Sequence, residues 1–228
     1  MSDRLAELAA QWSIAPGGVV ALERLLELLA GDEEAPTTVR DPAVAVDAHV
    51  ADALTGLLVP DLRGEVADIG AGAGIPGLVL AAARPDLRVT EVESLGRKCA
   101  FLERAIAAMG LANVSVRCAR AEEVGTTFDA VTARAVAPLP VLVEYAAPLL
   151  RDQGVLVAWK GAPEPGEVAD GDHAAAVLGL ERARVVDVPA FPGADRRSLY
   201  VYLKVGSLPN GYPRRLGMAR KRPLRAST

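Results

Sequence analysis

The residue types best suited to chemistry are concentrated in one segment, 68–77, which reads DIGAGAGIPG. Its glycines have the spacing G-x-G-x-G, whereas the dinucleotide-binding spacing G-x-G-x-x-G would need a glycine where Ile75 stands. Glycines let a backbone approach a ligand closely, and Pro76 suits the first position of a helix. Because an acid such as Asp68 sits poorly beside a pyrophosphate, the segment favours a cationic ligand without phosphate groups.

A second acidic position follows in the next predicted strand, 88–93, which carries Glu91 and Glu93 on one face. Glu93 ends the strand, where a carboxylate can accept hydrogen bonds from both hydroxyls of a ribose. We therefore expect Glu93 to be the ribose ligand and Glu91 to be a surface residue. Together these features describe a site for a nucleoside with a positive group and no phosphate, of which S-adenosylmethionine is the obvious candidate. The structural alternative is a tight strand-to-helix turn without a ligand.

The elements that must position these residues alternate along the chain after residue 63. Strand-like runs at 65–69, 88–93, 114–118, 128–132 and 154–159 are interspersed with helical stretches that begin near 76, 97 and 139. Repeated β-α units imply an α/β fold with a Rossmann-like, mostly parallel sheet and helices on both faces. Two further runs, 185–188 and 199–205, flank a turn-rich segment and predict an antiparallel C-terminal hairpin.

Helical stretches precede the alternating part. Apolar residues recur at helical spacing over 4–30, and another helix is expected over 43–58. We therefore expect three parts: an N-terminal helical segment that caps the core (1–62), an α/β domain that carries the S-adenosylmethionine site (63–206) and a basic C-terminal tail (207–228).

The composition excludes several classes of protein. Of 228 residues, 51% are hydrophobic and 24% are charged, which allows a sizeable core and argues against global disorder. No apolar run approaches the ~18 residues that span a bilayer, and the first residues lack the apolar region of a signal peptide. Cys99 and Cys118 are expected to be buried small hydrophobic residues rather than nucleophiles or part of a disulfide framework. No cysteine–histidine cluster has zinc spacing, so we expect a cytoplasmic protein that needs no metal.

The net charge of −4 is unevenly distributed. Residues 214–228 contain six basic and no acidic side chains, so the rest of the chain carries −10. A basic tail on an acidic body favours a polyanionic partner met at one end of the molecule. The alternative is a solubilising tail that contacts nothing.

Several motifs occur in a fixed order: the 68–77 loop, SLGRK at 94–98, RAEE at 120–123, FD at 128–129, RA at 134–135, WKG at 159–161 and RSL at 197–199. TTVRDP at 37–42, followed by His49 and Asp52, and a tail with YPRR and KRPL accompany them. This set resembles the bacterial small-subunit (16S) ribosomal RNA guanine-N7 methyltransferases, the glucose-inhibited division protein B family. The resemblance spans residues 37–224.

The resemblance implies roles for the matching residues. The implied cofactor-binding residues are Asp68, Gly70, Gly72, Ile75, Glu93, Ala121, Glu122 and Arg134. Ala121 and Glu122 would meet the adenine, and Arg134 would be the catalytic residue, as a positioning group between cofactor and base. The implied RNA-binding residues are Lys160, Arg197, Arg214, Arg215, Lys221 and Arg222. Ala48 and Ala51 stand where the family often has Arg and Leu, which leaves the roles of His49 and Asp52 open.

Guanine N7 keeps a free lone pair, so its methylation needs no prior proton removal and no general base. The resemblance implies an enzyme that methylates N7 of a specific guanine in 16S rRNA, and we expect it to be cytoplasmic and monomeric. Its partner would be the free rRNA, the small ribosomal subunit or an assembly intermediate, and not a membrane. The alternatives are a methyltransferase of another RNA or a small molecule, and a non-catalytic assembly factor that binds S-adenosylmethionine.

Overall fold

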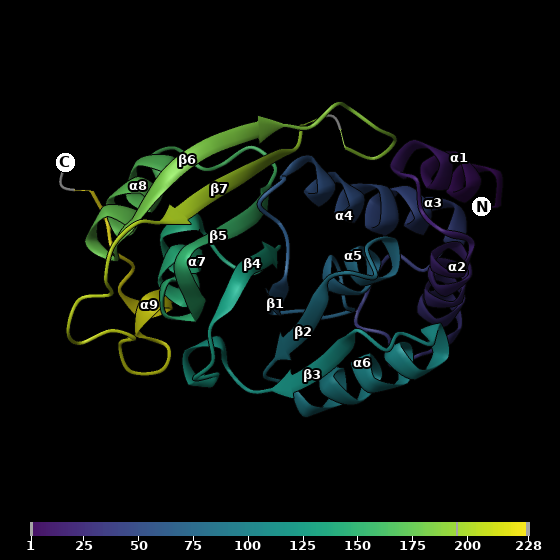
Figure 1. Cartoon of the computed structure of the whole chain (residues 1–228), viewed down its shortest axis with the longest axis horizontal. Coiled ribbons are helices and arrows are strands. Elements are labelled where there is room, and N and C mark those ends of the chain that lie inside the picture. The colour runs from purple at the N-terminus through teal and green to yellow at the C-terminus, as the bar shows by residue number, and fades with distance from the viewer. Residues whose placement is uncertain (1, 195, 227–228) are drawn as a thin grey trace.

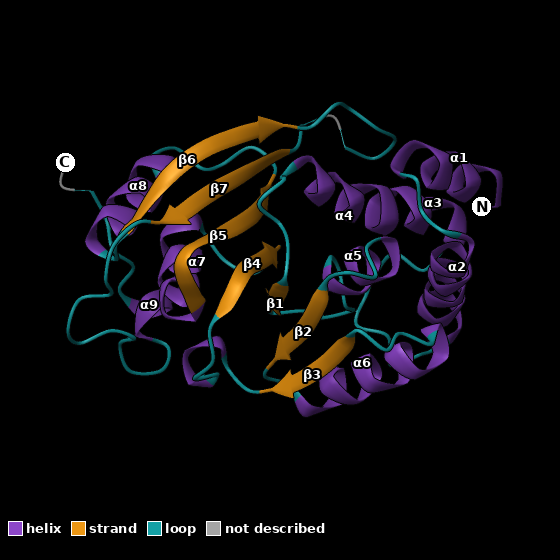
Figure 2. Ribbon diagram, in the orientation of Figure 1, coloured by secondary structure: helices purple, strands orange, loops and turns teal. Residues whose placement is uncertain are grey.

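The computed structural model describes residues 2–194 and 196–226. Strands and helices alternate from residue 65 onward, which confirms the predicted α/β class (Figure 1, Figure 2). The strands are β1 (Glu65–Ile69), β2 (Arg88–Glu93), β3 (Val114–Cys118), β4 (Phe128–Arg134), β5 (Leu150–Lys160), β6 (Leu180–Asp187) and β7 (Ser198–Lys204). The α-helices are α1 (Ser2–Trp12), α2 (Pro16–Gly31), α3 (Pro42–Ala45), α4 (Asp52–Leu54), α5 (Gly77–Ala83), α6 (Gly96–Met109), α7 (Leu139–Ala146), α8 (Glu167–Val177) and α9 (Met218–Lys221). A π-helical turn, η1 (Val46–Ala51), and the 3-10 turns η2 (Thr55–Leu58), η3 (Ala121–Glu123) and η4 (Ala147–Leu149) connect them.

In the described residues, seven strands form one sheet in the order β3-β2-β1-β4-β5-β7-β6. The strands from β3 to β5 pair in parallel, which places Asp68 beside Glu91 and Thr132 in register. β7 runs antiparallel to both β5 and β6, so the C-terminal hairpin is confirmed, and its second strand lies inside the sheet. The carboxyl ends of β1 to β5 therefore share one edge, where open α/β sheets bind ligands.

The two faces of the sheet pack against different helices because side chains alternate along a strand. Val66 of β1 belongs to the cluster that contains Leu80 of α5, whereas Ala67 belongs to the cluster that contains Leu139 of α7. Figure 1 shows α1 to α4 gathered beside α5 and α6, with α7, α8 and α9 at the other end of the molecule. The prediction of helices on both faces is confirmed. No helix in the described part of the chain is long and apolar enough to cross a membrane.

The N-terminal helices are more broken than predicted. The stretch 4–30 forms two helices, because Ser13 takes a left-handed conformation (φ 54°) and Pro16 begins a new helix. The helix expected over 43–58 runs through α3, η1, α4 and η2. π-helical turns such as η1 are rare, and those that occur are often found at functional sites. This one contains His49 and is followed directly by Asp52.

Two elements differ from the sequence-based expectation. Helix α8 was not predicted, since its sequence EVADGDHAAAV shows no clear helical periodicity, and it packs against α7. The C-terminal tail also packs on the body: Ala219 of α9 is 3% exposed and lies in the cluster around α7. The alternative of a tail that contacts nothing is therefore wrong.

Candidate functional site

The glycine-rich loop connects β1 to α5 at the carboxyl edge of the sheet. Gly70 has a φ of 68°, and an added Cβ there would lie 2.8 Å from Val136, so this position requires glycine. The amides of Gly70 and Ala71 donate to the carbonyl of Val92, which ties the loop to β2. An added Cβ at Gly72 would meet only the Gly70 carbonyl oxygen, at 3.7 Å. The loop therefore leaves open space beside its backbone at Gly72.

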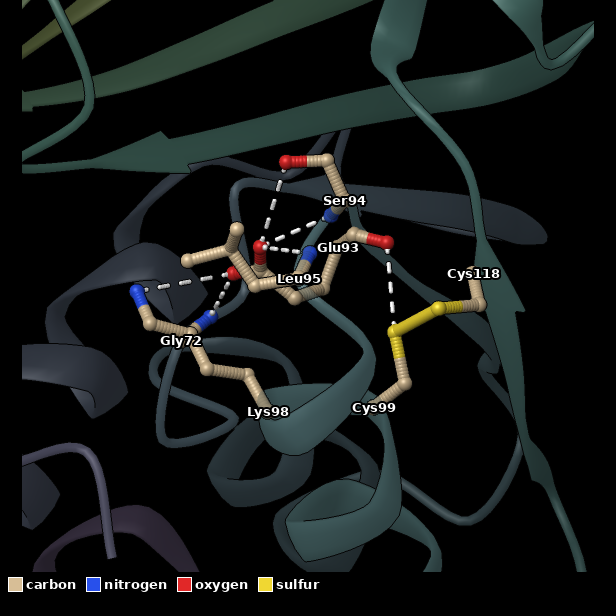
Figure 3. Close-up of a disulfide and its surroundings, with 7 residues drawn as sticks. All are labelled: Gly72, Glu93, Ser94, Leu95, Lys98, Cys99 and Cys118. Atoms are coloured by element: carbon tan, nitrogen blue, oxygen red, sulfur yellow. Dashed lines mark hydrogen bonds and ion pairs between the residues drawn. A yellow bond between two sulfur atoms is a disulfide. The ribbon is translucent and has the colours of Figure 1, made fainter.

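Glu93 ends β2, and its carboxylate holds the surrounding backbone together (Figure 3). Oε1 accepts hydrogen bonds from the amides of Ser94 (2.7 Å) and Leu95 (2.9 Å), and Oε2 accepts one from Gly72 (3.2 Å). Lys98 Nζ lies 3.8 Å from Oε2. A carboxylate has about four acceptor positions, so Oε2 retains capacity for a ligand hydroxyl.

Asp68 lies beneath the loop rather than among the residues that line a cleft. It is 1% exposed, and Oδ2 accepts a hydrogen bond from the amide of Gly77, at the start of α5 (2.9 Å). Oδ1 accepts one from the Thr132 hydroxyl (2.8 Å). Burial raises the pKa of Asp68 to about 6. Both oxygens are engaged inside the protein, so Asp68 supports the loop from below.

The expectation that Glu91 is a surface residue is wrong, because Glu91 is fully buried beside Asp68. The physical reason is that α5 covers this face of β2, so closely that an added Cβ on Gly77 would collide with the Glu91 carboxyl. Within the described residues, neither Glu91 oxygen has a hydrogen-bond partner. Burial, and then the charge of Asp68, raise the pKa of Glu91 well above its ordinary value. The pair therefore holds a proton at pH values where an exposed glutamate is ionised.

Glu91→Gln is expected to stabilise the protein at neutral and alkaline pH, because an amide has the same shape and needs no proton. In the wild type the unfolded state releases the Glu91 proton above the ordinary pKa of 4.5, while the folded state keeps it. The free energy of unfolding should then fall with rising pH by up to about 1.4 kcal/mol per pH unit. Denaturant unfolding at acidic and alkaline pH measures this decline, which should be smaller in the variant. Equal pH dependence would contradict a retained proton.

A cleft of about 1100 Å³ opens at the carboxyl edge of the sheet. Predicted site residues that line it are Gly70, Gly72, Ile75, Arg134, Lys160 and Arg197. Glu93, at the end of β2, is 5% exposed and is not among the lining residues, and neither are Ala121 and Glu122, which lie in η3 after β3. The lining also includes the segment 33–39, Arg97 and Lys98, which sequence reasoning did not assign to binding. The 37–42 and 94–98 motifs were the available signals for these positions.

Arg134, the last residue of β4, is fixed at this cleft by side chains and backbone from the N-terminal helices. Nη1 donates to Asp52 Oδ2 (2.5 Å) and to the carbonyl of Ala48 (2.9 Å). Nη2 lies 3.3 Å from His49 Nδ1, and because a guanidinium only donates, Nδ1 is the acceptor. The proton of neutral His49 then sits on Nε2, 3.0 Å from the Thr37 hydroxyl oxygen. Burial, followed by the charge of Arg134, lowers the pKa of His49 and favours this neutral form.

Three of the six predicted RNA-binding residues are paired with buried acids. The pairs are Lys160 with Glu167 (2.6 Å), Arg197 with Asp52 (2.7 Å) and Arg214 with Glu144 (2.6 Å). Lys160 and Arg197 also line the cleft, whereas Arg214 fastens the tail to α7. The remaining three, Arg215, Lys221 and Arg222, are exposed. Asp52 and Glu144 were missed because they lie far from Arg197 and Arg214 in the sequence, and Glu167 because it lies on α8, a helix that was not predicted.

The C-terminal segment reaches the predicted adenine side of the site. Glu122 Oε1 accepts a hydrogen bond from the amide of Gly217 (3.3 Å). Arg220 Nη2 donates to the carbonyl of Val136 (3.0 Å), the residue that an added Cβ on Gly70 would contact. The tail therefore lies against η3 and the connection between β4 and α7.

Cys99 and Cys118 form a disulfide, which corrects the expectation that both are buried small hydrophobic residues (Figure 3). Cys99 lies in the first turn of α6 and is 4% exposed, whereas Cys118 ends β3 and is exposed. They meet because β3 pairs with β2, and α6 begins just after β2 ends. The Sγ atom of Cys99 lies 3.3 Å from the carbonyl oxygen of Glu93. The disulfide thus braces the strand end that carries Glu93.

The fold, with its ligand-binding edge, is the class I methyltransferase fold. Solved structures share this fold at low sequence identity. A variant of MtNAS solved with S-adenosylmethionine has a TM-score of 0.56 at 18% identity, over 82% of this chain and 72% of that chain. The ribosomal protein L11 methylase of Lactobacillus delbrueckii subsp. bulgaricus has a TM-score of 0.53 at 18% identity, over 68% of this chain and 78% of that chain.

Comparison of the sequence with known proteins identifies the family within this class. Residues 21–198 match the family described as rRNA small subunit methyltransferase G. The Ribosomal RNA small subunit methyltransferase G of Rubrobacter xylanophilus is 43% identical over 216 residues, or 90% of this chain and 83% of that protein. The protein of the same name from Deinococcus radiodurans is 41% identical over 214 residues, or 88% of this chain and 83% of that protein. The chain therefore belongs to the rRNA small subunit methyltransferase G family, and the predicted resemblance is confirmed.

Proposed function

We propose that this protein transfers the methyl group of S-adenosylmethionine to N7 of a specific guanine in 16S rRNA. The observation that carries the proposal is the cleft at the carboxyl edge, where the glycine loop meets Arg134, Lys160 and Arg197. The glycine loop, tied to the Glu93 carboxylate, suits a cationic nucleoside without phosphates. The basic side chains suit the anionic backbone of RNA. One cleft can therefore receive both the cofactor and a substrate nucleotide.

The residues around the loop fit S-adenosylmethionine. We assign cofactor contacts to Gly70, Gly72, Ile75, Glu93, Ala121, Glu122 and Arg134, and support of the loop to Asp68. Open space at Gly72 admits a ligand beside the backbone, and Oε2 of Glu93 retains acceptor capacity for a ribose hydroxyl. The bound cofactor supplies a methyl group activated by a positively charged sulfur.

Methylation of guanine N7 requires little acid–base catalysis from the protein. N7 is an acceptor on the major-groove edge of guanine with a free lone pair, so no proton has to leave first. The protein has to align the base and exclude water. The methylated base gains positive charge, which a guanidinium would not stabilise. We therefore assign Arg134 to positioning a phosphate, the cofactor carboxylate or the guanine edge.

The exposed cations of the tail are expected to hold the RNA backbone. Replacing Arg215, Lys221 and Arg222 together by Gln should raise the KM for RNA. The slope of log affinity against log salt should become shallower by about 2, at about 0.7 for each phosphate contact. Because Arg214 keeps its pair with Glu144, the tail stays docked and the affinity for S-adenosylhomocysteine should not change.

The control replaces Arg63 and Arg88 by Gln, which removes two exposed positive charges where the tail variant removes three. Both are exposed and lie near the amino ends of β1 and β2, away from the cleft edge. Binding to 16S rRNA is measured at several salt concentrations for the tail variant, the control and the wild type. An unchanged slope in the tail variant would remove the tail from the RNA-binding surface.

The experiment that tests the function uses methyl-labelled S-adenosylmethionine. The protein is incubated with small-subunit RNA, or with subunits, from a strain that lacks this gene, and the labelled nucleotide is mapped. Label at N7 of one guanine is the expected result. Label at another atom, or no transfer while the cofactor binds, would contradict the proposal.

We further propose that the protein acts as a monomer in the cytoplasm. The acidic body disfavours binding to arbitrary RNA, which supports a folded substrate such as 16S rRNA within the small subunit or an assembly intermediate. Comparing initial rates on free rRNA, on intermediates and on assembled subunits distinguishes these substrates, and sedimentation of the protein checks the monomer.

A further inference from the structure

Asp52 brings together two of the basic residues of the cleft. Its side chain is fully buried, and its two oxygens serve different arginines: Oδ2 accepts from Arg134 Nη1 (2.5 Å) and Oδ1 accepts from Arg197 Nε (2.7 Å). Arg134 ends β4, and Arg197 immediately precedes β7, so the carboxylate connects two sheet elements through one N-terminal helix. A carboxylate shared in this way fixes the direction of both guanidinium groups.

The backbone of Asp52 is held independently of its side chain. The carbonyl oxygen accepts hydrogen bonds from Trp159 Nε1 (2.9 Å) and from the Thr55 hydroxyl (2.6 Å). The bond from Trp159 fastens α4 to the end of β5, and the bond from Thr55 holds the carbonyl within its own helical segment. A substitution that changes only the carboxylate therefore leaves the anchoring of this helix in place.

The charges of Asp52 and its two arginine partners sum to one positive charge. Arg134 and Arg197 carry two positive charges and Asp52 one negative charge, while burial, followed by the charge of Arg134, lowers the pKa of His49 and favours its neutral form. In the described part of the chain, no hydrogen bond is found from the Nη atoms of Arg197, which remain available as donors. An uncompensated charge with free guanidinium donors suits a phosphate group.

We propose that Asp52 is a positioning residue that orients Arg134 toward the reacting groups and Arg197 toward a backbone phosphate of the substrate nucleotide. RNA binding and methyl transfer are thereby linked through one carboxylate. This inference rests on the proposed function. The short helix that carries Asp52, together with the π-helical turn before it, places the carboxylate between the two arginines.

The test combines Asp52→Asn with Arg197→Ala. The Asn amide can accept from one arginine through its oxygen but presents its own donors to the other, so Arg197 loses its fixed direction. We expect Arg197→Ala to weaken binding to small subunits, with S-adenosylhomocysteine present, by about tenfold in the native background. In the Asp52→Asn background the same change should have less than about a twofold effect. Equal effects in both backgrounds would overturn the proposal.

Asp47→Asn is the matched control. It breaks the ion pair with Arg4 in the same helical region, at a residue that does not line the cleft, and should leave binding and turnover unchanged.

If Asp52→Asn does not fold, Arg134→Ala and Arg197→Ala provide a second cycle in which Asp52 is native. Each single variant leaves the buried carboxylate one partner, whereas the double variant leaves none. The double variant should therefore lose more unfolding free energy than the two single variants lose together. If the losses simply add, Asp52 does not have the shared role.

The binding and unfolding cycles do not depend on methyl transfer. A wild-type protein that methylates no guanine would refute the proposed function while the cycles still report on Asp52. Conversely, normal methylation with additive cycles would leave the proposed function intact and remove Asp52 from it.

Discussion

Arg134→Ala is expected to lower kcat about a hundredfold while the protein stays folded. Arg134 has contacts with Asp52, Ala48 and His49, so its guanidinium is held in one orientation at the cleft. Losing such a fixed group misplaces the reacting atoms, and a misplacement of about 1 Å can cost about 10²-fold in rate. Single-turnover methyl transfer with saturating cofactor and RNA measures the effect.

Arg134→Lys is the informative companion, because a lysine keeps the charge but not the planar fork. It should recover less than about a tenth of the lost rate. The fold should survive Arg134→Ala, since Asp52 keeps its pair with Arg197, and thermal unfolding checks this. Full activity of the alanine variant would remove Arg134 from the site.

Glu93→Ala is expected to weaken the binding of S-adenosylhomocysteine by about a hundredfold. Two losses combine: the acceptor for the ribose, and the carboxylate that holds the amides of Gly72, Ser94 and Leu95. A hydrogen bond to a charged group contributes about 1.5–3 kcal/mol, so one or two such bonds account for the change. Isothermal titration calorimetry measures it.

Two variants separate the ligand contact from the support of the loop. Glu93→Gln keeps one acceptor oxygen and should bind with intermediate affinity. Ser94→Pro removes one of the amide donors to Oε1 without touching the carboxylate, and should cost less than Glu93→Ala. Unchanged affinity in Glu93→Ala would show that the ribose is held by another group.

The α/β class, the parallel β-α order, the position of the glycine loop and the C-terminal hairpin were predictable from the sequence. Each of these follows from local pattern, because strand and helix periodicity and the turn chemistry of glycine act over a few residues. The ordered motifs also indicated the family. The division into 1–62, 63–206 and 207–228 stays a prediction.

Only the tertiary structure decided which polar groups face each other. Glu91 and Glu93 stand two residues apart on one strand, yet α5 buries the first beside Asp68 while the second faces the loop amides. The Cys99–Cys118 bond depends on the meeting of α6 and β3, and the partners of Lys160, Arg197 and Arg214 come from α8, α4 and α7. The sequence determined the strands, the glycine loop and the family of this protein, because those depend on neighbouring residues and motif order, but it did not determine α8 or the breaks in the N-terminal helices. The ionisation and orientation of its site were decided by packing, because burial and charge pairing depend on contacts between residues far apart in the chain.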